Sequence, residues 1–260
     1  TGSMQRSWES FRHACELVRN GYLGEIQKVI VSVTDPAIAY DLEEEPMPED
    51  RDWDRWIGPA PMNVFNSVIA PPVEDQSWPR WRDFKEFGGG TLCDWGAHMF
   101  DIAQWALGMD DPGPVELIAP KTPVPKRGLK MIYANGIEME HYEFGRGHGV
   151  EFHGTEGTMQ VSREFLQTNP ANIATAEIKS SDERLYYSDN HYANWIDGIR
   201  EHKETICPAE VGHRSASVCN IANIAYWVNR DLKWDPVAER FDDDEANSYL
   251  DKDYREGYEV

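Results

Sequence analysis

One stretch of the sequence, residues 115–161, constrains the fold more than any other. It contains five short segments with strand character, and turn signals rich in glycine separate several of them, at residues 134–136, 145–147 and 154–157. The five segments are residues 115–118, 131–133, 137–142, 149–153 and 158–161. Because tight turns between short strands favour hairpins, this stretch predicts an antiparallel sheet.

Helices are predicted on both sides of this stretch from the spacing of apolar residues. The predicted ranges are 7–20, 92–107, 191–202 and 212–230, and a β-branched run at 25–33 adds a strand. An acidic run at residues 242–245 indicates the solvated start of a last helix. Together these elements predict one α+β domain, with a large, open, mostly antiparallel sheet and helices on one face.

Residues 35–80 interrupt this pattern with a long, irregular excursion that holds eight of the chain's 16 prolines. An irregular segment of this length is uncommon in a compact domain and is often functional. The excursion contains Trp53 and Trp56, two of the chain's 10 tryptophans. We expect these rings either to form a wall for a polyhydroxylated ligand or to pack the excursion onto the domain.

The charge of the chain excludes two classes of partner. It carries 46 acidic and 25 basic side chains, which gives a net charge of −21. Because binding to nucleic acids and to anionic membranes requires clustered lysine and arginine, neither partner is expected. No run of about 18 apolar residues occurs, so no segment is expected to span a bilayer.

The four cysteines, at positions 15, 93, 207 and 219, form no C-x-x-C pair. We expect them to be small buried thiols rather than disulfides or metal ligands. His141, His148 and His153 lie in strand or turn segments and lack partners at ligand spacing, so they are expected on the faces of the sheet. No metal site is therefore predicted.

The sequence lacks the signatures of a nucleotide site. No strand is followed by G-x-G-x-x-G and a helix, and no G-x-x-x-x-G-K-[ST] loop occurs. Residues 88–90 are three glycines before a predicted helix, so their amides are candidates for binding an anion. Since the strand context is missing, we favour the interpretation that these glycines allow close approach of another backbone segment.

Asp94 and His98 are the strongest candidates for chemistry. They stand four residues apart in the predicted helix, so we expect them on the same face. A carboxylate beside an imidazole fixes its tautomer and raises its basicity, as a general base near neutral pH requires. The alternative is a structural ion pair with no role in catalysis.

Three groups of residues resemble the glucose–fructose oxidoreductase/inositol dehydrogenase (Gfo/Idh/MocA) family. They are D-x-W-x-G-P-A-P at residues 54–61, G-G-G-x-x-x-D-x-G-x-H-x-x-D at 88–101, and H-G-T-E-G at 153–157. Residues 207–215 and 232–235 resemble a bacterial dehydrogenase branch of this family. The resemblance runs from about Gln5 to the C-terminus. It implies a dihydrodipicolinate-reductase-like C-terminal domain without the Rossmann domain that binds NAD or NADP in the family.

The resemblance also implies roles for individual residues. His98 matches the acid/base of the family, and Asp94 matches the carboxylate that positions it or shares its proton. Arg82 and Lys85, next to the glycine run, become candidates for binding a hydroxyl or carboxylate of the substrate.

Further candidates lie outside the glycine motif. Trp53 and Trp56 line the entrance of the site if the excursion folds inward. His191 is a candidate substrate contact whose simpler role is to cap the helix that starts there. Gln5 and Arg6 resemble the segment that follows the last Rossmann strand and are expected at the edge of the cofactor site.

We therefore expect the substrate-binding and oligomerisation domain of an NAD- or NADP-dependent oxidoreductase that acts on a sugar, polyol or sugar derivative. No cofactor is expected on this chain alone, which supplies half of an active site, and self-association is expected through the sheet face. Two other functions stay open: a carbohydrate-binding or scaffold module without redox chemistry, and a cofactor-free lyase or hydrolase that uses the same Asp–His pair.

The first residues lead to an expectation about domain bounds. Residues 1–4 resemble a tag remnant followed by a start methionine, so the domain is expected to span residues 5–260. The native N-terminus would then be missing. A cytoplasmic location is the default, and export to the periplasm stays open.

Overall fold

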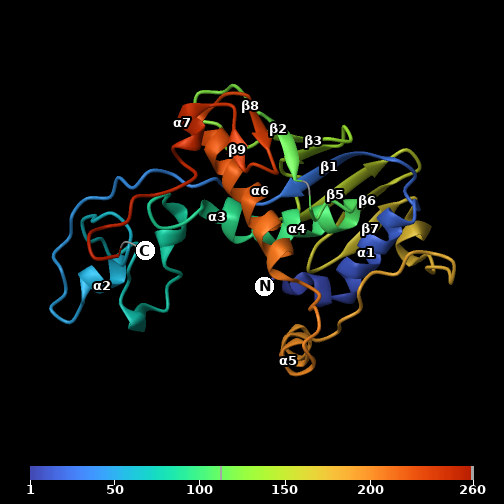
Figure 1. Cartoon of the computed structure of the whole chain (residues 1–260), viewed down its shortest axis with the longest axis horizontal. Coiled ribbons are helices and arrows are strands. Elements are labelled where there is room, and N and C mark those ends of the chain that lie inside the picture. The colour runs from blue at the N-terminus through green and yellow to red at the C-terminus, as the bar shows by residue number, and fades with distance from the viewer. Residues whose placement is uncertain (112, 259–260) are drawn as a thin grey trace.

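Alternating apolar and polar side chains build one nine-stranded sheet in the computed structural model, which describes residues 1–111 and 113–258 (Figure 1). The strands are β1 (Ile26–Ser32), β2 (Pro114–Ile118), β3 (Leu129–Tyr133), β4 (Glu138–His141), β5 (Gly149–Gly154), β6 (Thr158–Val161), β7 (Leu166–Asn169), β8 (Leu232–Asp235) and β9 (Arg240–Phe241). Their order across the sheet is β7-β6-β5-β1-β4-β3-β2-β8-β9.

The sheet is antiparallel except at its centre. Among the described residues, β1 pairs in parallel with β4, whereas the other seven strand pairings are antiparallel. Val29 of β1 lies between Met139 of β4 and Phe152 of β5, and all three side chains are fully buried on one face. This register gives the sheet one continuous apolar face.

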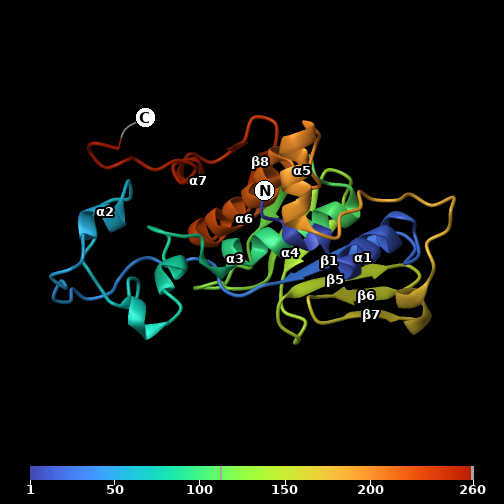
Figure 2. The same ribbon diagram turned by 90° about the horizontal axis from the view of Figure 1, so that it is seen from below.

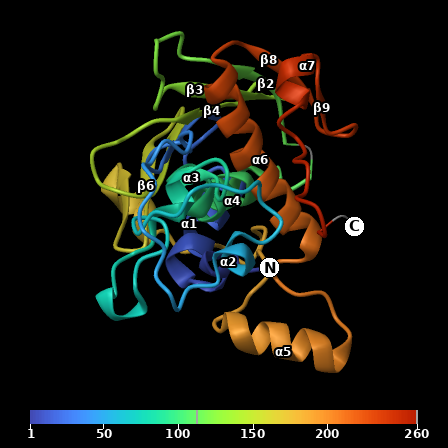
Figure 3. The same ribbon diagram turned by 90° about the vertical axis from the view of Figure 1, so that its left-hand side faces the viewer.

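Three helices, α1 (Glu9–Arg19), α4 (Gly96–Leu107) and α6 (Ala209–Val228), cover that apolar face, and Figure 2 shows them on one side of the strands. The predicted α+β fold with helices on one face is therefore confirmed. A fourth helix, α5 (His191–Glu201), lies apart from this layer and buries no side chain (Figure 3). No helix of the described residues is long and apolar enough to cross a membrane.

The structure differs from the predicted elements in two ways. The helix expected over residues 92–107 is divided into α3 (Gly90–Asp94) and α4, which meet at Trp95. Gly96 begins α4 close to α6, since a Cβ atom there would lie 3.1 Å from Cys219 Sγ. The strands β7, β8 and β9 lie outside the predicted segments; β7 and β9 contain one apolar residue each, which leaves no alternation to recognise.

The excursion of residues 35–80 builds a small core of its own at one end of the long axis of the molecule (Figure 1). It contains the short helix α2 (Trp53–Ile57). The buried side chains of this core, which Phe84 completes, are Trp53, Ile57, Phe65, Ile69, Ala70 and Phe84. Trp53, which is 9% exposed, therefore packs the excursion, the second of the two roles that the sequence left open.

Smaller predictions agree with the structure. All four cysteines are free thiols; Cys15, Cys207 and Cys219 are buried as expected, whereas Cys93 is half-buried. The acidic run at 242–245 starts the helix α7 (Asp244–Asn247), where the Asp243 side chain accepts a hydrogen bond from the Ala246 amide.

Gly90 shows why the glycine run contains glycines. Its φ angle is +68°, and a Cβ atom there would lie 2.5 Å from the backbone nitrogen of Ala37. The segment that leaves β1 therefore crosses α3 in direct backbone contact, as the close-approach interpretation predicts.

Replacing Gly90 with alanine should lower the free energy of unfolding by more than the about 1–2 kcal/mol that a left-handed conformation costs alanine. Gly145→Ala is the matched control, because Gly145 has a φ of +79° and no atom within 4 Å of an added Cβ. Urea unfolding of both variants measures the difference. Equal losses would show that the close contact with Ala37 carries no energetic weight.

His141 is a core residue, as expected for a residue on a sheet face. It is fully buried, and its ring nitrogens lie 2.7 Å from the Tyr226 hydroxyl and 3.0 Å from the Val33 carbonyl oxygen. Burial lowers the pKa of His141 to about 4. As the pH falls, His141 of the unfolded chain therefore binds a proton near its ordinary pKa of 6.5, whereas His141 of the folded chain binds one only near pH 4.

Stability should fall as the pH drops from about 6.5 towards 4, because only the unfolded state binds this proton over that range. The pKa difference corresponds to at most about 3 kcal/mol from His141. Urea unfolding between pH 7.5 and 4.5 measures this slope, and His141→Asn should flatten it. An unchanged slope in that variant would assign the acid sensitivity to other groups.

Candidate functional site

The glycine run and α3 place Asp94 next to Arg82. Arg82 belongs to a single 3-10 turn, Arg80–Asp83, just before the glycines. Its Nε atom lies 3.2 Å from Asp94 Oδ2, without the alignment of a hydrogen bond. The guanidinium is stacked between the rings of Trp78 and Trp81, at 4.2 and 4.5 Å from their centres. Asp94 is therefore engaged by a cation rather than by the imidazole that the sequence suggested.

His98 lies in the first turn of α4, on the wall of a cavity of about 370 Å³. Residues 1–3 and Ala97, Gly212 and Ser215 line the same cavity, which we call the His98 cavity. His98 Nδ1 is buried and has no hydrogen-bond partner within the described residues. An imidazole in this state has unused capacity to bind a ligand or a proton.

Charges around His98 favour its neutral form. Burial lowers the pKa of His98, the positive charge of Arg163 lowers it further, and the negative charge of Asp94 opposes them. A neutral imidazole at physiological pH is the form that accepts a proton.

Aromatic rings and a second histidine surround this position. The Trp95 ring lies 6.2 Å from the His98 ring and 4.3 Å from the His148 ring, measured between centres. The Arg163 guanidinium stands 4.3 Å from the centre of Trp95. Burial, with Arg163 as the next cause, also lowers the pKa of His148.

Arg163 and His148 are functional candidates that the sequence did not reveal. Arg163 follows β6, and His148 precedes β5, so only the folded sheet brings them to the start of α4. The Gln5 side-chain oxygen accepts two hydrogen bonds from Arg163, at 3.1 and 3.3 Å, which fix the guanidinium over Trp95. Only turn and strand signals surround these two residues in the sequence.

The remaining predicted residues lie in other places. Lys85 stands over the rings of Trp227 and Tyr249 and lines a separate cavity of about 820 Å³. Trp56 stacks on Trp53, with ring centres 4.7 Å apart, and lines a third cavity of about 470 Å³. The residues that line the His98 cavity do not recur in these two linings.

His191 and Gln5 support the N-terminal segment. The His191 ring nitrogens lie 3.0 Å from Ser7 Oγ and 2.8 Å from the Thr1 carbonyl oxygen, while Asn190 caps α5. Gln5 is fully buried and donates to Met99 Sδ at 3.6 Å. Ser3, within the expected tag remnant, is buried, and its carbonyl oxygen accepts from the Cys207 thiol at 3.4 Å.

Arg6 lies in the interior and is 2% exposed. Its guanidinium binds the Asp101 carboxylate through three hydrogen bonds of 2.7–3.1 Å and Asp110 through two of 2.6 and 2.9 Å. As folded here, Arg6 holds the domain together and presents almost no surface to a cofactor.

The side chains and backbone amides at the site determine whether it suits a metal ion, a substrate or a pyrophosphate. Among the described residues, no three His, Cys, Asp or Glu side chains gather as a metal site. The neutral His98 next to a cavity suits the substrate side of a nicotinamide reaction. A pyrophosphate needs a cradle of backbone amides at the start of a longer helix than the five residues of α3. The arrangement therefore suits proton transfer and substrate binding.

The profile of an oxidoreductase family, described as its C-terminal alpha/beta domain, matches residues 12–260. None of the curated proteins matches the chain.

Several solved structures are similar to the chain. An oxidoreductase from Thermotoga maritima superposes with a TM-score of 0.50 at 15% identity, over 92% of this chain and 63% of that one. A NAD-binding protein from Listeria innocua gives 0.48 at 19% identity, over 88% and 62%. An oxidoreductase domain protein from Kribbella flavida gives 0.46 at 16% identity, over 92% and 64%. The chain thus spans less than two-thirds of the length of each.

The charges around His98 predict opposite effects of two substitutions on its pKa. Arg163→Gln should raise the pKa of His98, because the nearby positive charge is lost. Asp94→Asn should lower the pKa, because the opposing negative charge is lost. Titration of the His98 ring signals by NMR measures both, with Arg200→Gln on the exposed α5 as control. Shifts of the same sign in the two variants would contradict this electrostatic account.

Proposed function

The chain belongs to the Gfo/Idh/MocA oxidoreductase family as its C-terminal α/β domain, and we propose that it is the substrate-binding and proton-transfer half of a nicotinamide-dependent oxidoreductase. The proposed substrate is a sugar, polyol or sugar derivative, whose CH–OH group becomes C=O. The observation that carries this proposal is His98, a neutral imidazole with an unpartnered buried nitrogen on the wall of a small cavity.

In the proposed reaction, His98 accepts the proton of the substrate hydroxyl. A bound nicotinamide, NAD or NADP, supplies the acceptor for the hydride that leaves the same carbon. Protonation turns the imidazole into a cation beside the Arg163 charge, so Asp94 stabilises this state through its negative charge. In the reverse direction His98 returns the proton to the carbonyl oxygen.

The residues around His98 orient the substrate and limit water. Trp95 and His148 pack against each other beside His98, and Arg163 over Trp95 provides a cation for a hydroxyl or carboxylate of the substrate. Arg82, paired with Asp94, holds that carboxylate at the end of α3. A neutral base beside a positioned cation suits the oxidation of an alcohol.

We further propose that the domain, residues 5–260, self-associates through the uncovered face of the sheet. That face carries alternating charges: Lys28 bridges Glu138 and Glu140, and Lys130 bonds Glu138 at 3.0 Å. An ordered, mixed-sign surface of this kind is self-complementary in charge.

His98→Ala should reduce kcat by about 10²–10⁴-fold in the protein that also carries its nucleotide-binding part, since the base that takes the proton is lost. The assay measures reduction of NAD⁺ and NADP⁺ with a panel of sugars and polyols. Arg200→Ala is the control, because Arg200 is exposed on α5 and lines none of the three cavities.

Two outcomes would contradict this function. Full activity of His98→Ala would remove His98 from the reaction, and turnover of a glycoside without any nucleotide would favour a lyase or hydrolase. The isolated chain should bind none of NAD⁺, NADH, NADP⁺ and NADPH in calorimetric titration.

A further inference from the structure

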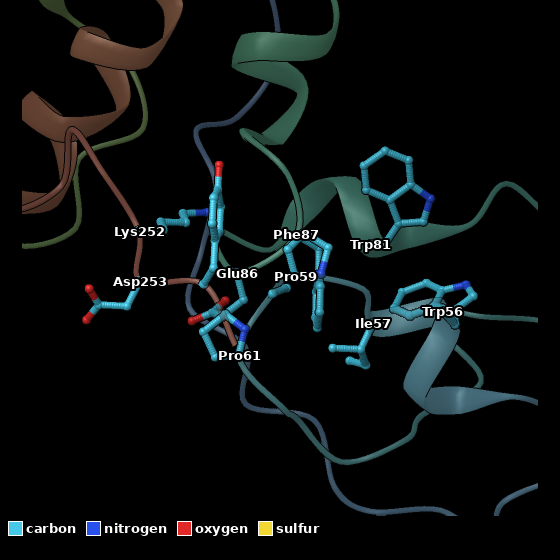
Figure 4. A pocket seen from close by; sticks show the side chains of 11 residues that line it. Trp56, Ile57, Pro59, Pro61, Trp81, Glu86, Phe87, Lys252 and Asp253 are labelled. Atoms are coloured by element: carbon cyan, nitrogen blue, oxygen red, sulfur yellow. The ribbon is translucent and has the colours of Figure 1, made fainter. Parts of the chain in front are cut away.

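The cavity beside Trp56 is separate from the His98 cavity and lies between the excursion and the C-terminal segment. Figure 4 shows Trp56 and Trp81 on one side of it, and Lys252 and Asp253 of the C-terminal segment on the other. We call it the aromatic cavity. It adjoins the 820 Å³ cavity, because both linings include Pro61, Glu86, Phe87, Lys252 and Tyr254.

Helix α6 separates these cavities from His98. Gly212 and Ser215 of α6 line the His98 cavity, whereas Ser217, Asn220 and Trp227 line the 820 Å³ cavity on another face of the helix. A ligand in the aromatic cavity therefore does not occupy the place of the reacting group.

The walls of the aromatic cavity are braced from both sides. The Arg255 guanidinium donates to the Gly58 carbonyl oxygen at 2.8 Å and bonds the Asp54 carboxylate, which ties the C-terminal segment to α2. Lys252 Nζ donates to the Lys85 carbonyl oxygen at 2.6 Å. Trp56 stacks on Trp53 and packs edge-to-face with Phe87, with ring centres 5.6 Å apart. A cavity held in this way loses little conformational freedom on binding.

Polar edges accompany the ring faces. Within the described residues, no hydrogen bond reaches the indole N–H of Trp56 or Trp81, or the Tyr254 hydroxyl. Glu86 Oε2 accepts from the Tyr40 amide at 2.9 Å, and Oε1 has no such partner. The cavity thus offers flat apolar surfaces together with unused donors and acceptors.

Charged side chains of both signs line the aromatic cavity, which disfavours an ionic ligand. An alkylammonium suits aromatic rings, but it would share the cavity with the Lys252 ammonium. An anion would meet the Glu86 and Asp253 carboxylates. A neutral ring with hydroxyl groups avoids both conflicts, because its weakly positive C–H bonds pack on the negative faces of the rings while its hydroxyls bond the polar edges.

We propose that the aromatic cavity and the adjoining 820 Å³ cavity form a second carbohydrate site, which holds a neutral oligosaccharide away from His98. Their volumes, about 470 and 820 Å³, lie in the usual range for ligand sites. The proposal goes beyond the redox function and does not depend on it, since the site needs neither His98 nor a nucleotide.

The test is calorimetric titration of this chain with cellotriose, maltotriose and xylotriose. At least one trisaccharide should bind saturably, and Trp56→Ala and Tyr254→Ala should each weaken binding by up to about tenfold, because a ring platform is lost. Trp195→Ala on α5 is the matched control, since it removes an exposed tryptophan far from the cavity lining. His98→Ala should leave the affinity unchanged.

Glu86→Gln keeps the shape of the wall and should also weaken binding, which maintains the test if Trp56→Ala disturbs the excursion. Three results would overturn the proposal: no saturation by any trisaccharide at millimolar concentration, loss of binding in His98→Ala, or tighter binding of tetramethylammonium or inorganic phosphate than of any trisaccharide.

Discussion

The buried ion pair between Arg6 and Asp101 is the interaction on which the geometry of the site depends. Asp101 is fully buried, and its Oδ1 also accepts from Ser215 of α6 at 2.9 Å. One carboxylate thus joins the N-terminal segment, α4 and α6. A buried charge is tolerated only when it is paired and hydrogen-bonded. The positions of these three elements relative to one another are therefore fixed by the bonds to Asp101. His98 stands one helical turn before Asp101 and is positioned by the same contact.

The ion pair also explains why the site is built from distant segments. Gln5, next to Arg6, orients Arg163, which follows β6, and Arg163 adds to the effect of burial in lowering the pKa of His98. Asp94 is directed to Arg82 on the other side of α3. After burial, the pKa of His98 is therefore shifted more by the Arg163 cation across the sheet than by the Asp94 carboxylate nearby in sequence.

Local patterns were sufficient to predict most of the strands, most helices and the close approach at Gly90, because each depends on the residues of one segment. The break at Trp95 was missed because it follows from packing of Gly96 on α6. Arg163 and His148 were missed because long-range strand pairing places them. For Trp56 the sequence left open a ligand wall or packing of the excursion; the ring stacks on Trp53 and lines a cavity separate from that of His98, since the excursion has its own core.

The central position of β1 has a consequence for how the chain folds. β2 to β4 and β5 to β7 are pairs of hairpins whose contacts are close in sequence. β1 joins the two blocks, although about a hundred residues separate it from β4 and β5. Closing so large a loop costs entropy before any strand pairing compensates it. We expect the hairpins to form early and the insertion of β1 to limit the folding rate, with the glycine run locked beneath residues 35–37 only after that step.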